Sequence, residues 1–82
     1  MNKRNLLEKL LSGSRNIRFS EAVACAESFG FRLERIHGSH HIYSHPGVPE
    51  LVNLQDFKGK AKDYQIRQLL ELIEIYNLNA GD

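Results

Sequence analysis

Three short runs with the composition of β-strands follow one another between residues 31 and 55, and only turn-forming residues separate them. The runs are FRLERI at 31–36, HHIYSH at 40–45 and LVNLQ at 51–55, with HGS and PGVPE between them. Glycine, serine and proline favour turns, and proline also interrupts strand pairing. Strands joined by such short turns form an antiparallel sheet, so this stretch predicts a three-stranded meander.

An amphipathic helix is predicted on each side of the meander. Ser20 is a suitable N-cap for the first helix, Gly30 stands where a left-handed residue would end it, and Asp63 is the predicted cap of the second. The apolar stripes are Ala22, Val23, Ala26 and Phe29 in the first helix and Ile66, Leu69, Leu70, Ile73 and Tyr76 in the second. Both stripes need cover from one face of the sheet, which leaves the other face open. The predicted fold class is therefore α+β, in the order α-β-β-β-α, with a three-stranded antiparallel sheet and the helices on one face.

A further helix is predicted in front of this fold, because the leucines of NLLEKLL, residues 5–11, recur at helical spacing before SGS interrupts them. The predicted organisation is an N-terminal helical extension, residues 1–16, and one domain, residues 17–82, since 82 residues bury a single modest core. The single cysteine excludes an internal disulfide. Without a signal peptide or an apolar run of about 18 residues, we expect a cytoplasmic protein that makes no contact with a membrane.

Positive charge is concentrated in two segments, although the net charge is only +1. Residues 1–18 hold five lysines and arginines against one glutamate, and residues 58–67 hold four against one aspartate. If the fold brings these segments together, they would form a surface that binds phosphates. Ordinary solvated surface charge explains the same pattern equally well.

All four histidines, at positions 37, 40, 41 and 45, fall in the middle strand or next to it. Side chains alternate between the faces of a strand, so His41 and His45 share a face about 13 Å apart while His40 points the opposite way. Such a row does not surround one metal ion, and we expect neither a metal nor another cofactor. A histidine on the open face beside lysines suits a different chemistry. An imidazole can take the proton of a ribose 2′-hydroxyl, whose oxygen then attacks the adjacent phosphodiester. The alternative is that such a histidine is an ordinary hydrogen-bonded surface residue without a catalytic role.

The segment FGFRLERIHGSHHIYSHP, followed by LVNLQ, a lysine-bearing loop and the closing helix QIRQLLELIEIYNL, resembles the HicA toxin family, also called YcfA-like proteins. The resemblance covers about residues 17–78 and implies a fold like the double-stranded-RNA-binding domain. It also implies a metal-independent endoribonuclease that cleaves mRNA, arrests growth and is neutralised by a HicB-type antitoxin encoded beside it. Many family members carry a proline and a histidine in or just after the third strand, where this chain has NLQDF.

The family's catalytic histidine belongs to a glycine-serine-histidine motif, which implies that His40 is catalytic, with His41 as the alternative if the register slips by one. If Tyr43 packs toward the helices, His41 shares that side and His40 lies on the open face, although Ile42 competes for the core. The RNA-binding residues that we expect are Arg35, Gly38, Ser39, Lys58, Lys60 and Lys62. Two other functions fit the same surface: a non-catalytic RNA-binding module, and a domain whose basic face docks a protein partner such as the antitoxin.

Overall fold

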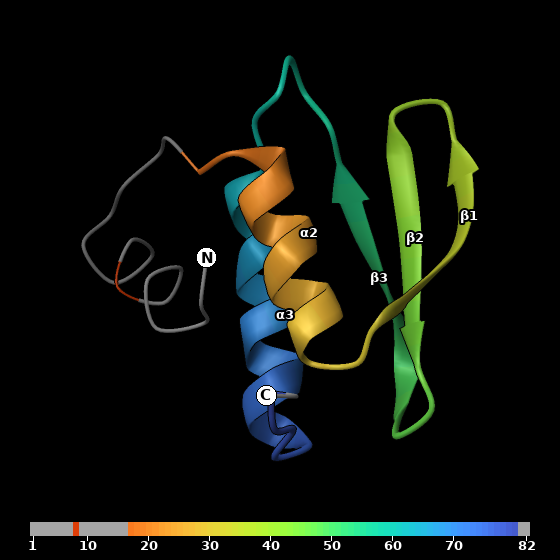
Figure 1. Ribbon diagram of the computed structural model, residues 1–82, viewed down its shortest axis with the longest axis vertical. Helices are drawn as coiled ribbons and strands as arrows, with labels where there is room; N and C mark the ends of the chain where they lie inside the picture. The colour runs from red at the N-terminus through yellow and green to blue at the C-terminus, as the bar shows by residue number, and fades with distance from the viewer. Residues whose placement is uncertain (1–7, 9–16, 81–82) are drawn as a thin grey trace.

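The computed structural model describes residue 8 and residues 17–80 (Figure 1). Its elements are α2 (Phe19–Ser28), β1 (Arg32–His37), β2 (His40–His45), β3 (Val48–Gln55) and α3 (Asp63–Ile75). The strands pair antiparallel in the order β1-β2-β3, so the predicted α-β-β-β-α fold is confirmed. The predicted N-terminal helical extension, residues 1–16, lies outside the described residues except for Glu8.

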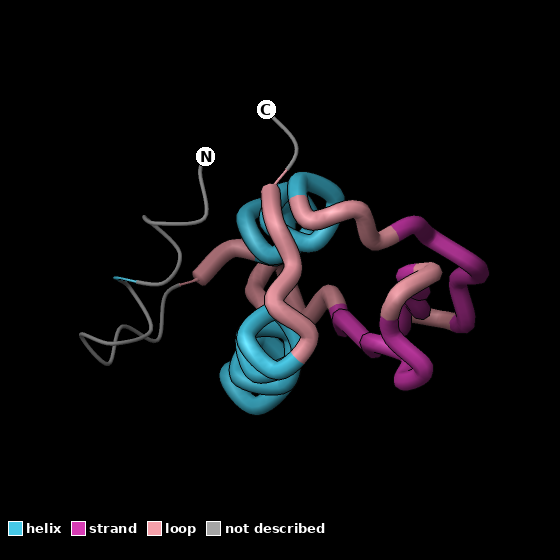
Figure 2. Tube along the Cα trace, turned by 90° about the horizontal axis from the view of Figure 1, so that it is seen from below, coloured by secondary structure: helices cyan, strands magenta, loops and turns pink. Residues whose placement is uncertain are grey.

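The fold has two layers, with α2 and α3 next to each other on one side of the sheet (Figures 1 and 2). The core lies between the layers, and its largest fully buried apolar side chains are Phe29, Phe31, Ile17, Leu54, Ile66 and Leu69. Burying one side chain of this size stabilises the fold by about 1.5–3 kcal/mol. The helices contact β3 most closely, while β1 forms the far edge of the sheet and all of its residues are exposed.

The helices begin at slightly different residues from those predicted. α2 starts at Phe19, so Ser20 lies inside the helix instead of capping it. The N-terminus of α2 is capped by a residue of its own first turn, since the carboxylate of Glu21 accepts a hydrogen bond from the backbone N–H of Arg18 at 3.2 Å. Asp63 is the first residue of α3 and not its cap. Its negative charge still stabilises the positive end of the helix dipole.

The third strand is longer than predicted. β3 begins at Val48, and only Pro46 and Gly47 form the turn before it. Pro49 therefore lies inside a strand, where it cannot donate a ladder hydrogen bond. It is accommodated because β3 is an edge strand whose pairing with β2 is irregular at this end.

The strand register assigns each residue to a face of the sheet. Tyr43 pairs with Leu33 and Val52, and because Tyr43 is only 3% exposed, this face is the one that the helices cover. Alternation then places His41 on the helix side and His40 on the open face. Tyr43 therefore packs toward the helices, which is the condition under which the sequence places His40 on the open face.

Candidate functional site

A two-residue turn, Gly38 and Ser39, joins β1 to β2 and positions the candidate histidine. His37 and His40 pair across this turn. Gly38 has φ +63, a left-handed conformation that suits the first central position of a type II′ hairpin turn and strains other residues. A Cβ added at Gly38 would meet nothing within 4 Å, so the backbone of the turn is open to a ligand.

His40 is half-buried on the open face, and its ring is oriented by an amide from the neighbouring strand. Its Nδ1 lies 3.0 Å from Nδ2 and 3.2 Å from Oδ1 of Asn53. The amide can donate to Nδ1 or accept a proton from it, so Asn53 satisfies Nδ1 in either tautomer. Nε2 makes no hydrogen bond within the described part of the chain. His40 therefore presents Nε2 to the open face either as a proton acceptor or as a proton donor.

His41 points the other way, toward the start of α2. Its ring centroid lies 4.7 Å from that of Phe19, with the ring planes tilted by 56°. Its Nδ1 lies 3.2 Å from the carbonyl oxygen of Ser39, which accepts a hydrogen bond when Nδ1 carries the proton. These contacts favour a packing role for His41 and explain why two adjacent histidines are not equivalent.

The other two histidines lie apart from this arrangement or at its edge. His45 lies at the opposite end of β2, about 17 Å from His40 along an extended strand. Its Nδ1 accepts a hydrogen bond from the backbone N–H of Gly47 at 2.9 Å, and its ring centroid lies 5.1 Å from that of Phe31. His37 is exposed at the end of β1. Within residue 8 and residues 17–80, no three His, Cys, Asp or Glu side chains group as they would around a metal ion.

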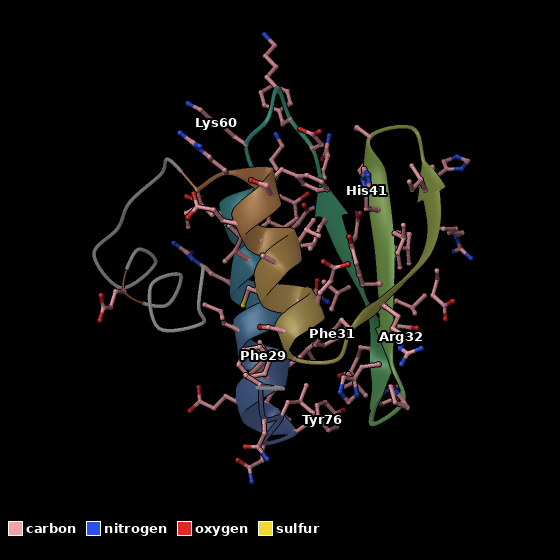
Figure 3. All side chains as sticks on the ribbon, viewed as in Figure 1. Phe29, Phe31, Arg32, His41, Lys60 and Tyr76 are labelled. Atoms are coloured by element: carbon pink, nitrogen blue, oxygen red, sulfur yellow. The ribbon has the colours of Figure 1, made fainter. Side chains whose placement is uncertain are left out.

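The predicted cations on the loop between β3 and α3 lie at the same end of the molecule as the turn. The backbone N–H of Asp56, at the start of this loop, donates to the carbonyl oxygen of Ser39 at 2.9 Å. Figure 3 shows Lys60 and His41 toward that end. The loop carries the exposed Lys58 and Lys60 and the half-buried Lys62. Hydrogen bonding thus joins the lysine loop to the turn that carries the histidine.

Two arginines add to this charge. Arg35 is exposed and pairs with Ile42, so it shares the open face with His40. Arg18 was not predicted as a site residue, and it forms an isolated antiparallel bridge with Lys60. The described end of the first basic segment therefore lies beside the second basic segment. The rest of the first segment lies in residues that the structure does not describe, apart from Glu8.

Asn53 was also missed by the sequence analysis. The alternation in LVNLQ already placed Asn53 on the opposite face from Val52 and Leu54. That pattern did not show which residue of β2 lies next to it, because this depends on the strand register. The observed register pairs Asn53 with Ile42, which sets its amide diagonally against His40.

A family model described as HicA toxin of bacterial toxin-antitoxin matches residues 19–75. The chain belongs to the HicA toxin family. The matched HicA segment runs from the first residue of α2 to the last residue of α3, so it contains the turn, all four histidines and the lysine loop. No curated protein matches this HicA-family chain. Within its described residues, no helix is both long enough and apolar enough to cross a membrane.

Proposed function

We propose that this HicA-family protein is an endoribonuclease that cleaves mRNA, arrests growth and is neutralised by a HicB-type antitoxin. The observation that carries the proposal is the environment of His40, which is half-buried on the open face with Nδ1 held by Asn53. Membership of a toxin family supports the biological role. The proposal includes a cytoplasmic location, where mRNA is found, and the division into a 1–16 extension and a 17–82 domain.

In the proposed reaction, Nε2 of His40 takes the proton of a ribose 2′-hydroxyl. The 2′-oxygen attacks the adjacent phosphorus, and the bond from phosphorus to the 5′-oxygen breaks. The products are a 2′,3′-cyclic phosphate and, once the leaving oxygen gains a proton, a 5′-hydroxyl end. The reaction balances without a metal ion or a cofactor. General acid–base catalysis of this kind contributes about 10²–10⁴-fold to a rate.

Binding of the RNA backbone falls to the groups around the turn. Arg35 lies on the same face as His40, and the lysine loop is hydrogen-bonded to the turn itself. Positive charge at this end attracts phosphates and stabilises the negative charge that develops on the phosphorane. The open backbone of Gly38 and the hydroxyl of Ser39 are proposed to position the substrate next to His40.

Inducible expression in bacteria, alone and together with the product of the neighbouring gene, tests this function. We expect the wild-type protein to arrest growth and fragment transcripts, the neighbouring product to relieve both effects, and His40→Ala to show neither. Growth arrest with intact transcripts would favour a non-catalytic RNA-binding module. Fragmentation that persists in His40→Ala would refute the role of His40.

A further inference from the structure

We propose that Phe57, together with Lys58 and Lys62, forms a platform on which one unpaired base of the RNA stacks. This inference rests on the proposed function, because it names the form of RNA that the same site takes. Phe57 was not among the residues that the sequence analysis singled out.

The ring of Phe57 is half exposed, and the ammonium groups of Lys58 and Lys62 lie over it. Phe57 is 48% exposed and does not belong to the buried core. The Nζ of Lys62 lies 4.1 Å from the ring centroid, and the Nζ of Lys58 lies 5.8 Å from it. An aromatic surface next to lysines offers a base a stacking partner and offers the attached phosphate a positive charge.

The backbone that carries this ring is held in one conformation. The N–H of Phe57 donates to the carbonyl of Lys60 at 2.9 Å, and the N–H of Lys60 donates to the carbonyl of Phe57 at 3.0 Å. Lys58 and Gly59 between them have φ +53 and +83, the pattern of a type I′ turn. The side chain of Asp56 accepts a further hydrogen bond from the N–H of Gly59 at 2.8 Å.

Lys58 is therefore a lysine in a left-handed conformation that glycine or asparagine adopts at lower cost. This strain is maintained at a residue whose ammonium group lies near the exposed ring. A rigid turn also loses little conformational freedom when a ligand binds, so its contacts are converted efficiently into affinity.

The platform lies close in the structure to the proposed catalytic group. Asp56, which precedes Phe57, is hydrogen-bonded through its backbone N–H to Ser39, which precedes His40. The ring and the imidazole therefore project from two adjoining backbone segments. A nucleotide stacked on Phe57 would keep a neighbouring phosphodiester near Nε2 of His40.

This arrangement suits single-stranded RNA in preference to a duplex. Proteins bind double-stranded RNA mostly through its shape, its phosphates and its 2′-hydroxyl groups, because its bases are already paired and stacked. An exposed aromatic ring gains nothing from such bases. Stacking on aromatic side chains beside a basic surface is the usual means of binding unpaired bases, and it tolerates any base sequence.

Fluorescence of Phe57→Trp tests the platform directly, because the chain contains no tryptophan of its own. The probe is a single-stranded 2′-O-methyl oligonucleotide, which cannot be cleaved by attack of a 2′-hydroxyl. We expect the oligonucleotide to quench the indole emission by stacking, and we expect an abasic oligonucleotide and inorganic phosphate to leave it unchanged. The matched control is Ile75→Trp, at an exposed position in the last turn of α3. Its emission should not respond.

Affinity measured by anisotropy of the same labelled oligonucleotide gives the magnitude. Stacking of one base on one ring corresponds to about 5- to 150-fold in affinity, so Phe57→Leu should weaken binding by at least about fivefold. Lys58→Ala should instead lower the slope of log affinity against log salt concentration by about one. A duplex of the same sequence should bind wild type and Phe57→Leu equally.

The outcomes separate the platform from the proposed function. Binding of the oligonucleotide without quenching in Phe57→Trp, or with equal affinity in Phe57→Leu, would overturn the platform while His40-dependent cleavage still stood. No binding of any oligonucleotide to folded wild-type protein would overturn both. Circular dichroism of each variant establishes folding, and the half-exposed position of Phe57 makes these substitutions compatible with the fold.

Discussion

Replacing Asn53 by aspartate changes the proton affinity of the proposed catalytic base without removing its hydrogen-bond partner. The amide of Asn53 lies 3.0–3.2 Å from Nδ1 of His40, so a carboxylate at the same position would accept a hydrogen bond from Nδ1–H. The negative charge stabilises the imidazolium more than the neutral ring, and a base that is protonated cannot take a proton from the 2′-hydroxyl. We therefore expect Asn53→Asp to need a higher pH for cleavage.

The size of this change follows from the strength of the two hydrogen bonds. A neutral hydrogen bond contributes about 1 kcal/mol net, and one to a charged group contributes about 1.5–3 kcal/mol. The difference of roughly 1 kcal/mol corresponds to a displacement of about 0.7 pH unit, since one unit is about 1.4 kcal/mol. Cleavage in Asn53→Asp should accordingly fall about fivefold at acidic pH, while the rate on the alkaline plateau changes little.

The assay is the initial rate of RNA cleavage between pH 5 and pH 9, measured for wild type and Asn53→Asp at constant ionic strength. Asn79→Asp is the matched control, because it makes the same chemical change at an exposed residue beyond the end of α3. Its profile should overlie that of the wild type. An active, folded Asn53→Asp protein with an unshifted profile would refute the coupling between Asn53 and the base.

Three further predictions concern stability. Gly38→Ala should lower the free energy of unfolding by about 1–2 kcal/mol, the cost of the positive φ alone, because a Cβ at this position meets nothing within 4 Å. Gly30→Ala should lower the free energy of unfolding by about 2–4 kcal/mol, since it adds a contact at 3.1 Å from Nε2 of His45 to the strain of φ +90. Equal losses for Gly30→Ala and Gly38→Ala in chemical denaturation would contradict the role of that contact. The phenol of Tyr76 donates a hydrogen bond to Glu50, and this bond, then burial and the charge of Glu50, raise the pKa of Tyr76 above 10.0. Because the pKa of Tyr76 is higher in the folded state than in the unfolded state, the hydrogen bond stabilises the folded protein below about pH 10. This stabilisation is lost as the pH rises through the pKa of the folded state. The difference in Tm between wild type and Tyr76→Phe should therefore close in alkaline solution. A gap that stays constant to pH 11 would count against this hydrogen bond.

The order of the elements could be predicted because local signals agree with the final structure. The turn residues between the strands and the stripes of the two helices follow from backbone preferences and from periodicity alone. The left-handed conformation of Gly30 was likewise predictable from its place after a helix, and its φ of +90 confirms it.

The details of strand pairing could not be predicted in the same way. Pairing of β1 with β2 shifts between Leu33 and Arg35, and pairing of β2 with β3 shifts between Tyr43 and His45. Each irregularity depends on contacts between strands, which a periodic pattern within one strand does not contain. The start of β3 at Val48 was missed for the same reason.

In the candidate site, too, features set within one strand were predictable and contacts between distant segments were not. Alternation along β2 was enough to separate His40 from His41 once one buried residue was known. The contact between His40 and Asn53 and the hydrogen bond that joins the lysine loop to Ser39 connect distant parts of the sequence. Phe57 was missed because its exposure is decided by the turn that carries it and not by its residue type.

The central claim, that His40 cleaves RNA without a metal ion, is tested most directly by a time course with purified protein and a long single-stranded RNA. Wild type, His40→Ala and His41→Ala are compared with and without EDTA, each after its folding has been verified. We predict fragments with wild type and His41→Ala that persist in EDTA, and intact RNA with His40→Ala. Intact RNA with folded wild-type protein, or cleavage that is lost in His41→Ala and retained in His40→Ala, would contradict the account.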